Sequence, residues 1–157
     1  MKVVVQRVRE GSVTIGGLVH EHIAKGYVIL LGIREGDVEK DARFLAGKCA
    51  NMRVFEDEHG KMNLSLADVA GSVLVISQFT LYADAQKGNR PSFAAAARAE
   101  SAEPLYEAFV QHMKTLLGHD RVRTGVFGAM MDVMIVNEGP VTIILESAPP
   151  GDPKGMH

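Results

Sequence analysis

The sequence lacks tryptophan, holds a single cysteine and carries little net charge. With only six Phe and three Tyr among 157 residues, the core has to be built mainly from aliphatic side chains and Met. The lone Cys49 excludes an intramolecular disulfide, which is typical of a reducing compartment. A formal net charge of −2 disfavours a protein that coats nucleic acid through a broad basic field, but it is compatible with one that holds only an RNA end.

Long hydrophobic runs are also missing. No apolar run approaches the roughly 20 residues of a membrane-spanning helix, and the N-terminal MKVVVQRVREGS lacks the apolar core and cleavage site of a signal peptide. We therefore expect a cytoplasmic protein. The length suits one domain, expected over residues 1–148, and the Pro/Gly-rich residues 149–157 are expected to form a flexible tail.

Short segments with β-type patterns are abundant. A hairpin is predicted from 12–15 to 18–23, because Gly16 and Gly17 can both adopt positive φ in the turn. The near-continuous apolar stretch YVILLGI, residues 27–33, predicts a central strand buried on both faces. Further strands are expected at 3–8, 53–55, 73–79, 121–124, 131–136 and 141–146.

Two segments carry helical spacing. The first is residues 37–51, with Asp37 as the expected N-cap. The second is expected to begin around Pro104, placed in its first turn, and to end at Gly118. Strands in hairpins with helices between the groups indicate an α+β fold: a hairpin-rich sheet or barrel-like core flanked by two main helices.

The usual catalytic motifs are absent, since there is no GxGxxG, P-loop or GxSxG sequence. His20 and His22 share one strand face, but without a third ligand at a recognisable spacing they are better interpreted as exposed polar residues than as a metal site. Cys49 is expected to be a small buried hydrophobe. Ser77 and Thr80 end a buried strand, where structural hydrogen bonding is favoured over nucleophilic catalysis because no His is near in sequence.

Two loops leave open questions. The loop AQKGNRPSF carries Lys87, Arg90 and Phe93, which suit either a small phosphate-contact patch or an ordinary solvated loop. The segment MDVMIVNEGPVTIILE, residues 131–146, is predicted to be a hairpin. Pro140 is awkward there because it donates no hydrogen bond to a ladder, and a tight hairpin prefers Asn-Gly or Asp-Gly.

Two motifs carry a resemblance to a known family. One is SQFTL, residues 77–81, and the other is NEGPVT, residues 137–142. Together they resemble the SQxxL and NxGPxT signatures of the D-aminoacyl-tRNA deacylase family, also called D-tyrosyl-tRNA deacylases. The resemblance covers about residues 1–147 and includes the segments VVVQRV, FEDEHGKMNLSL, KGNRPSF, EPLYEAF and TGVFGAMM.

The resemblance implies a homodimeric hydrolase that requires no cofactor and no metal. Its expected reaction is hydrolysis of the ester between a D-amino acid and the 3′ end of tRNA, and removal of glycine mischarged onto a noncognate tRNA. It also implies that the Gly139–Pro140 bond is cis, an isomer that costs only about 0.5–1 kcal/mol at X-Pro. The motif of one subunit is expected to reach the active site of the other.

Chiral selection is expected to depend on the backbone of this motif. Its carbonyl oxygens can accept hydrogen bonds from the substrate α-ammonium group, after which an L side chain would collide with Gly139 and Pro140. A D side chain or a glycine hydrogen points outward, so the site would distinguish chirality and not side-chain identity. Asn137 and Thr142 flank the motif and can hydrogen-bond its backbone.

The resemblance further implies that catalysis takes place at Ser77, Gln78, Phe79 and Thr80. Backbone N–H groups near Phe79 and Thr80 would hold the scissile carbonyl and its oxyanion, assisted by the terminal 2′-hydroxyl of the tRNA. Three supporting roles are expected as well, with Leu81 shaping the pocket, Arg7 bracing the Gly-Pro segment, and Phe127 and Met130 walling the terminal adenine.

Two other functions are compatible with these residues: a serine or threonine ester hydrolase, and a noncatalytic RNA-binding module. A relative within the superfamily with a trans Gly-Pro bond, which acts on a mischarged L-amino acid, is a further alternative. The Asn137-x-Gly139-Pro140-x-Thr142 pattern favours the cis type.

Overall fold

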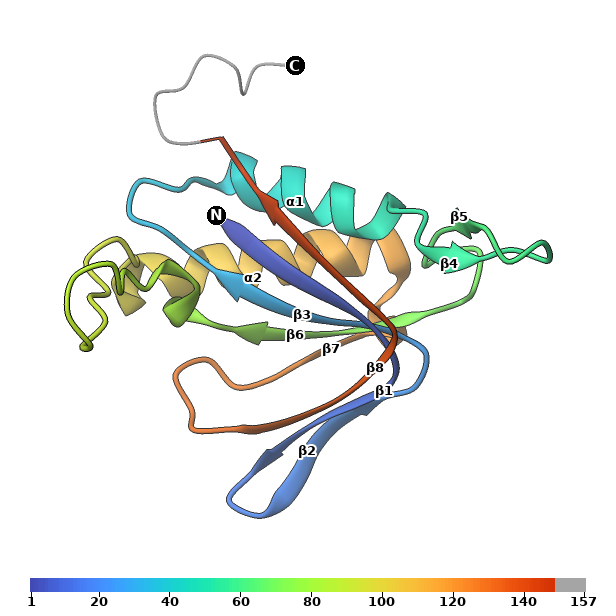
Figure 1. Cartoon of the computed structure of the whole chain (residues 1–157), viewed down its shortest axis with the longest axis horizontal. Coiled ribbons are helices and arrows are strands. Elements are labelled where there is room, and N and C mark those ends of the chain that lie inside the picture. Colours follow the sequence, from blue (N-terminus) through green and yellow to red (C-terminus); the bar gives the residue numbers. More distant parts are fainter. Residues whose placement is uncertain (149–157) are drawn as a thin grey trace.

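The computed structural model describes residues 1–148 and shows a strongly curved sheet with two helices lying together on one side of it (Figure 1). The expected tail, residues 149–157, lies outside the described residues. The strands are β1 (Lys2–Ile15), β2 (Leu18–Ile23), β3 (Gly26–Gly32), β4 (Phe55–Glu56), β5 (Met62–Leu64), β6 (Ser72–Ser77), β7 (Val122–Thr124) and β8 (Asp132–Glu146). The helices are α1 (Glu39–Asn51), α2 (Ala99–Leu117) and the short 3-10 turns η1 (Phe79–Tyr82) and η2 (His119–Arg121).

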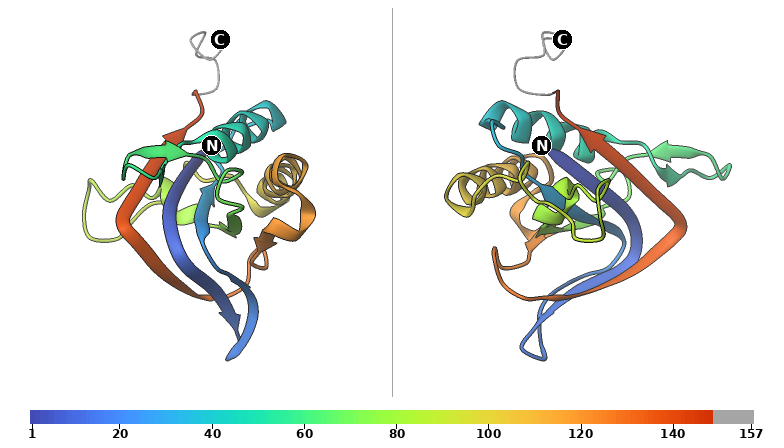
Figure 2. Two further views of the ribbon diagram at one scale, coloured as in Figure 1. Left: turned by 90° about the vertical axis from the view of Figure 1, so that its right-hand side faces the viewer. Right: turned by 60° about the vertical axis from the view of Figure 1, so that its left-hand side comes forward.

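Strand β1 organises the sheet. Along one edge it pairs antiparallel with β3 over Lys2–Val8 and then with β2 over Gly11–Ile15. Along its other edge it pairs with β8 from Lys2 to Thr14. The sheet continues through parallel pairings of β3 with β6 and of β6 with β7. The α+β prediction is therefore confirmed, and Figure 2 shows how far β1 and β8 bend around the core.

The central strand β3 is buried on both faces, as predicted. Tyr27, Ile29 and Leu31 pack into the larger core, beneath α1 and α2. Val28 points the other way, into a smaller cluster that includes Leu74. Because strand side chains alternate between faces, one continuous apolar run supplies both cores.

The β1–β2 hairpin is confirmed, with φ of +58° at Gly16 and +83° at Gly17. The segments 3–8 and 12–15, expected as separate strands, belong to one strand, β1. Arg9 and Glu10 between them are exposed, but the strand continues through both residues. A small β4–β5 hairpin spans the polar loop around Gly60. The strand predicted at 73–79 ends at Ser77, where η1 begins two residues later.

Both helix starts differ from the prediction. Val38 and not Asp37 is the N-cap of α1; buried Asp37 instead pairs with the Met1 ammonium group at 2.6 Å. Helix α2 begins at Ala99, so Pro104 lies inside it and not in its first turn, whereas Gly118 caps its C-terminus with φ +96° as expected. Neither helix described in residues 1–148 is long and apolar enough to cross a membrane.

The prediction of a hairpin at 131–146 is wrong. Residues 132–146 form one long strand, β8, because β1 offers a partner long enough for both halves. The pairing jumps from Val8–Asn137 to Gln6–Thr142, so residues 138–141 bulge opposite Arg7. A bulge tolerates a proline because no ladder hydrogen bond is required there, which accounts for Gly-Pro within an otherwise regular strand.

Candidate active site

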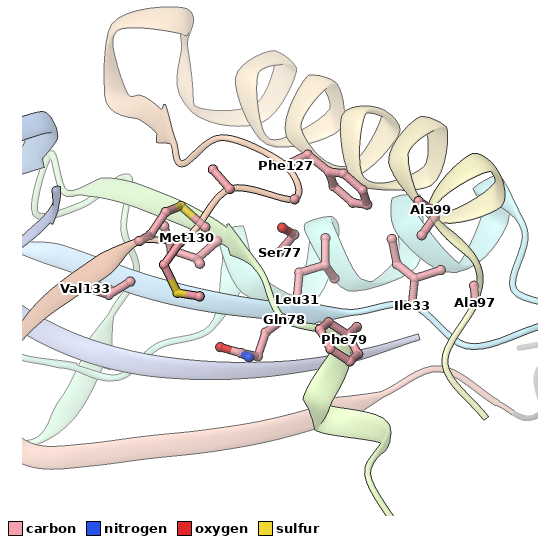
Figure 3. A pocket seen from close by; sticks show the side chains of 15 residues that line it. Leu31, Ile33, Ser77, Gln78, Phe79, Ala97, Ala99, Phe127, Met130 and Val133 are labelled. Carbon is pink, nitrogen blue, oxygen red and sulfur yellow. The ribbon is translucent and has the colours of Figure 1, made fainter. Parts of the chain in front are cut away.

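A hollow of about 480 Å³ lies at the carboxyl ends of β3 and β6. The start of α2 and the loop between β7 and β8 close its sides, as Figure 3 shows. Its lining is mostly apolar and consists of Leu31, Ile33, Ile76, Ser77, Gln78, Phe79, Ala97, Ala99, Ala102, Phe127, Gly128, Ala129, Met130, Met131 and Val133.

The motif SQFTL forms the end of β6 and the turn η1. Ser77, Gln78 and Phe79 line the hollow, whereas Thr80 is exposed outside it and accepts a 2.6 Å hydrogen bond from Gln78 Nε2. Leu81 lies behind the lining, close enough to Gly32 that a Cβ there would sit 3.0 Å from that of Leu81. The structure therefore brings three of the four expected catalytic residues into one cavity.

Two backbone N–H groups are free at this position. Gln78 N–H donates to the Leu31 carbonyl and Leu81 N–H to the Gln78 carbonyl. The N–H groups of Phe79 and Thr80, at the start of η1, have no acceptor within residues 1–148, as is usual for the first residues of a helix. They are available to a carbonyl oxygen arriving from outside.

Phe127 and Met130 both belong to the lining, so the structure places them opposite the SQFTL motif. Phe127 is held from behind by Tyr106 of α2, at 5.7 Å between ring centroids. Met130 has 91% of its surface exposed. An apolar side chain so exposed at the edge of a cavity is suited to covering an apolar face of a ligand.

Sequence reasoning missed the alanine-lined side of the hollow. Ala97, Ala99 and Ala102 form it, and their small side chains leave the space open. The run AAAARAES was a visible signal, but its meaning depends on α2 starting at Ala99. The sequence places Phe93 in a basic loop without a defined partner; in the fold its ring meets Phe79 edge-on, with 5.1 Å between ring centroids, and links that loop to the site.

The lining contains no group that titrates near neutral pH. None of its fifteen residues is Asp, Glu, His, Cys, Lys or Arg. Cys49 is buried in the core, and burial raises the pKa of its thiol to about 12, which suits an inert residue. No cluster of three or more potential metal ligands occurs within residues 1–148. The polar groups that this lining itself offers are backbone N–H and C=O groups, the Ser77 hydroxyl and the Gln78 amide.

The second motif builds a rigid, exposed bulge. Asn137 Oδ1 accepts from the Val141 N–H at 3.1 Å, and Asn137 Nδ2 donates to Thr142 Oγ1 at 3.0 Å. Gly139 and Pro140 are exposed between these ties, and the bond joining them is cis, as expected. The motif therefore exposes Gly139, which has no side chain, and Pro140, while the Asn137 side chain is held within the bulge.

Arg7 lies beneath this bulge and is only 5% exposed. Its Nε donates to the Glu138 carbonyl at 3.1 Å and its Nη1 donates to the Val54 carbonyl at 2.6 Å. Its Nη2 lies 3.9 Å from Glu56 Oε1. One buried guanidinium thus connects β1, the bulge of β8 and the β4 hairpin.

Within one chain the two motifs are far apart. Ser77 pairs with Leu31, Leu31 with Val3, and Val3 with Leu145, six residues beyond Gly139 along β8. With about 4.8 Å between strands and 3.3 Å per residue, the separation is on the order of 20 Å. The bulge therefore does not contribute to the hollow of its own chain.

Comparison with known proteins identifies the family. The model of the D-Tyr-tRNA(Tyr) deacylase family matches residues 4–146. The chain belongs to this family. D-aminoacyl-tRNA deacylase of Halalkalibacterium halodurans is 55% identical over 147 residues, covering 94% of this chain and 99% of the relative. The protein of that name from Thermus aquaticus is 56% identical over 148 residues, covering 94% and 96%.

Solved structures agree with this family's fold. The structure described as c-Myc DNA Unwinding Element Binding Protein is 43% identical, with a TM-score of 0.90, covering 95% of this chain and all of that one. A structure described as a probable eukaryotic D-amino acid tRNA deacylase has a TM-score of 0.80. At 16% identity, the second shares the fold alone.

Proposed function

We propose that this protein hydrolyses the ester bond of D-aminoacyl-tRNA, releasing the free D-amino acid and tRNA. The observation that carries the proposal is the sequence identity of about 55% between this chain and D-aminoacyl-tRNA deacylases, over nearly the whole length of the chain. The hollow supports it, because an apolar cavity with Phe127 and Met130 on one side suits a terminal adenine. Glycine mischarged onto a noncognate tRNA is proposed as a second substrate.

Catalysis in this proposal uses main-chain donors. The free N–H groups of Phe79 and Thr80 hold the scissile carbonyl and stabilise its developing negative charge. The terminal 2′-hydroxyl of the tRNA assists, since the lining offers no titratable base. A Thr80 nucleophile is disfavoured because its hydroxyl lies outside the cavity, bonded to Gln78. Ser77 has no histidine in the lining to activate it.

Selection of the D enantiomer is assigned to the exposed backbone of Gly139 and Pro140. Carbonyl oxygens of this bulge accept hydrogen bonds from the substrate α-ammonium group, and an L side chain would then meet the backbone itself. The ties from Asn137 and the brace from Arg7 support this role, because a steric barrier has to be rigid to reject a ligand. A D side chain or a hydrogen atom points outward and is accepted.

The separation of the two motifs supports a homodimer. The bulge lies about 20 Å from the hollow of its own chain. A bulge that contacts substrate in a given hollow therefore has to belong to a second copy of the chain. We therefore propose a symmetric dimer in which each Gly139–Pro140 segment completes the partner's site. A cytoplasmic location fits a substrate as abundant there as aminoacyl-tRNA.

The deciding experiment is deacylation of D-tyrosyl-tRNA and L-tyrosyl-tRNA by the purified protein in the presence of a chelator. We expect rapid loss of the D ester while the L ester is spared. A preference of about a thousandfold would correspond to roughly 4 kcal/mol of discrimination. Equal hydrolysis of both esters would indicate a generic esterase, and no hydrolysis of either ester by a folded dimer would favour a noncatalytic RNA-binding module.

A further inference from the structure

A second hollow, of about 600 Å³, lies on the other side of the loop that follows β7. Gly125 and Val126 line it from this loop, α2 forms its long wall, and His20 of β2 contributes from the edge. Its lining is more polar than that of the first hollow and consists of His20, Glu103, Tyr106, Glu107, Val110, Gln111, Lys114, Thr124, Gly125, Val126 and Phe127.

Phe127 is the residue that the two hollows share. They also follow one another along α2, with Ala99 and Ala102 in the first and positions from Glu103 to Lys114 in the second. At 1.5 Å per residue, the middle of the second wall lies roughly 10 Å beyond Ala102. That spacing suits two successive residues of one extended polymeric ligand that passes over the Phe127 ring.

The second hollow offers groups that recognise a polar base. Glu103 and Glu107 lie four residues apart on α2, so both carboxylates face the same side. Neither forms an ion pair within residues 1–148. Two unpaired like charges on one helix face are unfavourable in isolation. An occupant that donates hydrogen bonds to them would offset that repulsion.

We propose that this second hollow binds the nucleotide that precedes the terminal adenosine, and that it recognises that nucleotide as cytidine. Carboxylates accept from the exocyclic N4 amino group, which is how Glu and Asp distinguish cytosine. Lys114 supplies a positive charge in the lining for the adjoining phosphate and His20 a ring nitrogen that can donate to it, and Phe127 separates the two bases. Since tRNAs share the 3′ sequence CCA, such a subsite accepts all of them.

The inference rests on the proposed function and is tested with amide analogues that cannot be hydrolysed. D-tyrosine is linked to 3′-amino-adenosine alone, or to the same nucleoside preceded by cytidine or by uridine. Each is measured as a competitive inhibitor of D-tyrosyl-tRNA hydrolysis. We expect the cytidine form to bind about tenfold more tightly than the adenosine form. The uridine form should be weaker than the cytidine form, because its O4 is an acceptor.

Glu107→Ala supplies the matched test, with the exposed Glu39→Ala on α1 as its control. In Glu107→Ala the ratio of the uridine to the cytidine inhibition constant should fall towards one, whereas in Glu39→Ala it should keep its original value. Equal inhibition by the adenosine and cytidine forms would overturn the subsite and leave the proposed function standing. A protein that does not hydrolyse D-tyrosyl-tRNA would refute the proposed function, and the subsite with it.

Discussion

The identity of a single residue matters most to this fold where two backbone segments are in close contact. At Gly26, the first residue of β3, an added Cβ would lie 1.7 Å from the Ser72 carbonyl oxygen, and φ is +156°. Gly26 joins the paired ends of β3 and β6. Gly47, in the middle of α1, has nothing within 4 Å of an added Cβ. The same substitution should therefore have opposite effects at the two glycines.

Gly26→Ala is expected to lower the free energy of unfolding by about 3 kcal/mol or more, because the backbone has to move to admit the methyl group. Gly47→Ala is expected to raise it by about 0.5–1 kcal/mol, since alanine restricts the unfolded chain and favours helix. Urea unfolding followed by circular dichroism measures both. An unchanged free energy of unfolding in Gly26→Ala would contradict the close contact between Gly26 of β3 and Ser72 of β6.

At this scale the sequence could predict the roles of residues in local turns, but not close contacts between segments that are far apart in the chain. Gly16 and Gly17 were predictable because a hairpin turn is local. The need for glycine at position 26 arises from Ser72, which is 46 residues away and reaches it only through the parallel pairing of β3 with β6. Sequence alone predicts a helix cap at Asp37 for the same reason, because its partner in the fold, the Met1 ammonium group, lies 36 residues before it.

At the scale of elements, the bulge of β8 is held by a side chain from its neighbouring strand. Arg7→Met should remove hydrogen bonds to the Glu138 and Val54 carbonyls. We expect the free energy of unfolding to fall by about 2 kcal/mol, because the buried Val54 carbonyl and the partly buried Glu138 carbonyl both lose their donor. Activity on D-tyrosyl-tRNA should fall further than this stability loss explains, because Gly139 and Pro140 would no longer be braced.

Arg53→Met is the matched control. Arg53 and Asn63 are exposed, Arg53 donates to the Asn63 carbonyl at 2.7 Å, and within residues 1–148 it forms no hydrogen bond with the bulge. Its loss should change stability by under about 1 kcal/mol and leave D/L discrimination unaltered. If Arg7→Met also keeps full discrimination between D- and L-tyrosyl-tRNA at a temperature where it is folded, then the bulge does not depend on Arg7.

Element types were largely predictable, and element ends were not. The alternation of YVILLGI and the apolar spacing of the helices are properties of the segments themselves. The two halves of β8 carried the pattern of a hairpin, and only the length of β1, which pairs with both, makes them one strand. The cavity was partly foreseen through Ser77, Phe127 and Met130, but its alanine wall depends on where α2 begins.

At the scale of the whole molecule, charge predicts how the substrate is held. A protein of net charge −2 with an apolar hollow should contact few phosphates. We expect log kcat/KM for D-tyrosyl-tRNA to fall with log salt concentration with a slope of magnitude about one to two. Lys87→Met and Arg90→Met should each reduce that slope modestly. A much steeper slope would indicate a broad phosphate interface.

The proposed dimer is testable by combining two defective subunits. Gly139→Ala damages the bulge, since its Cβ would lie 3.1 Å from Val141 N and 3.1 Å from Arg7 Nη2 at a φ of +125°. Ala99→Trp fills the hollow from an exposed position that lines it. Each variant alone should be nearly inactive on D-tyrosyl-tRNA if both parts are required at every site.

Refolding the two variants together should restore activity, because a mixed dimer has one site built from an intact hollow and an intact bulge. Random pairing makes about half of the dimers mixed, each with one working site of two, so about a quarter of the wild-type activity is expected. Circular dichroism and sedimentation of each variant alone establish that it is folded and dimeric. Two such folded, dimeric variants that stay inactive after mixing would place the bulge and the hollow of each site in the same chain, which the sheet register opposes.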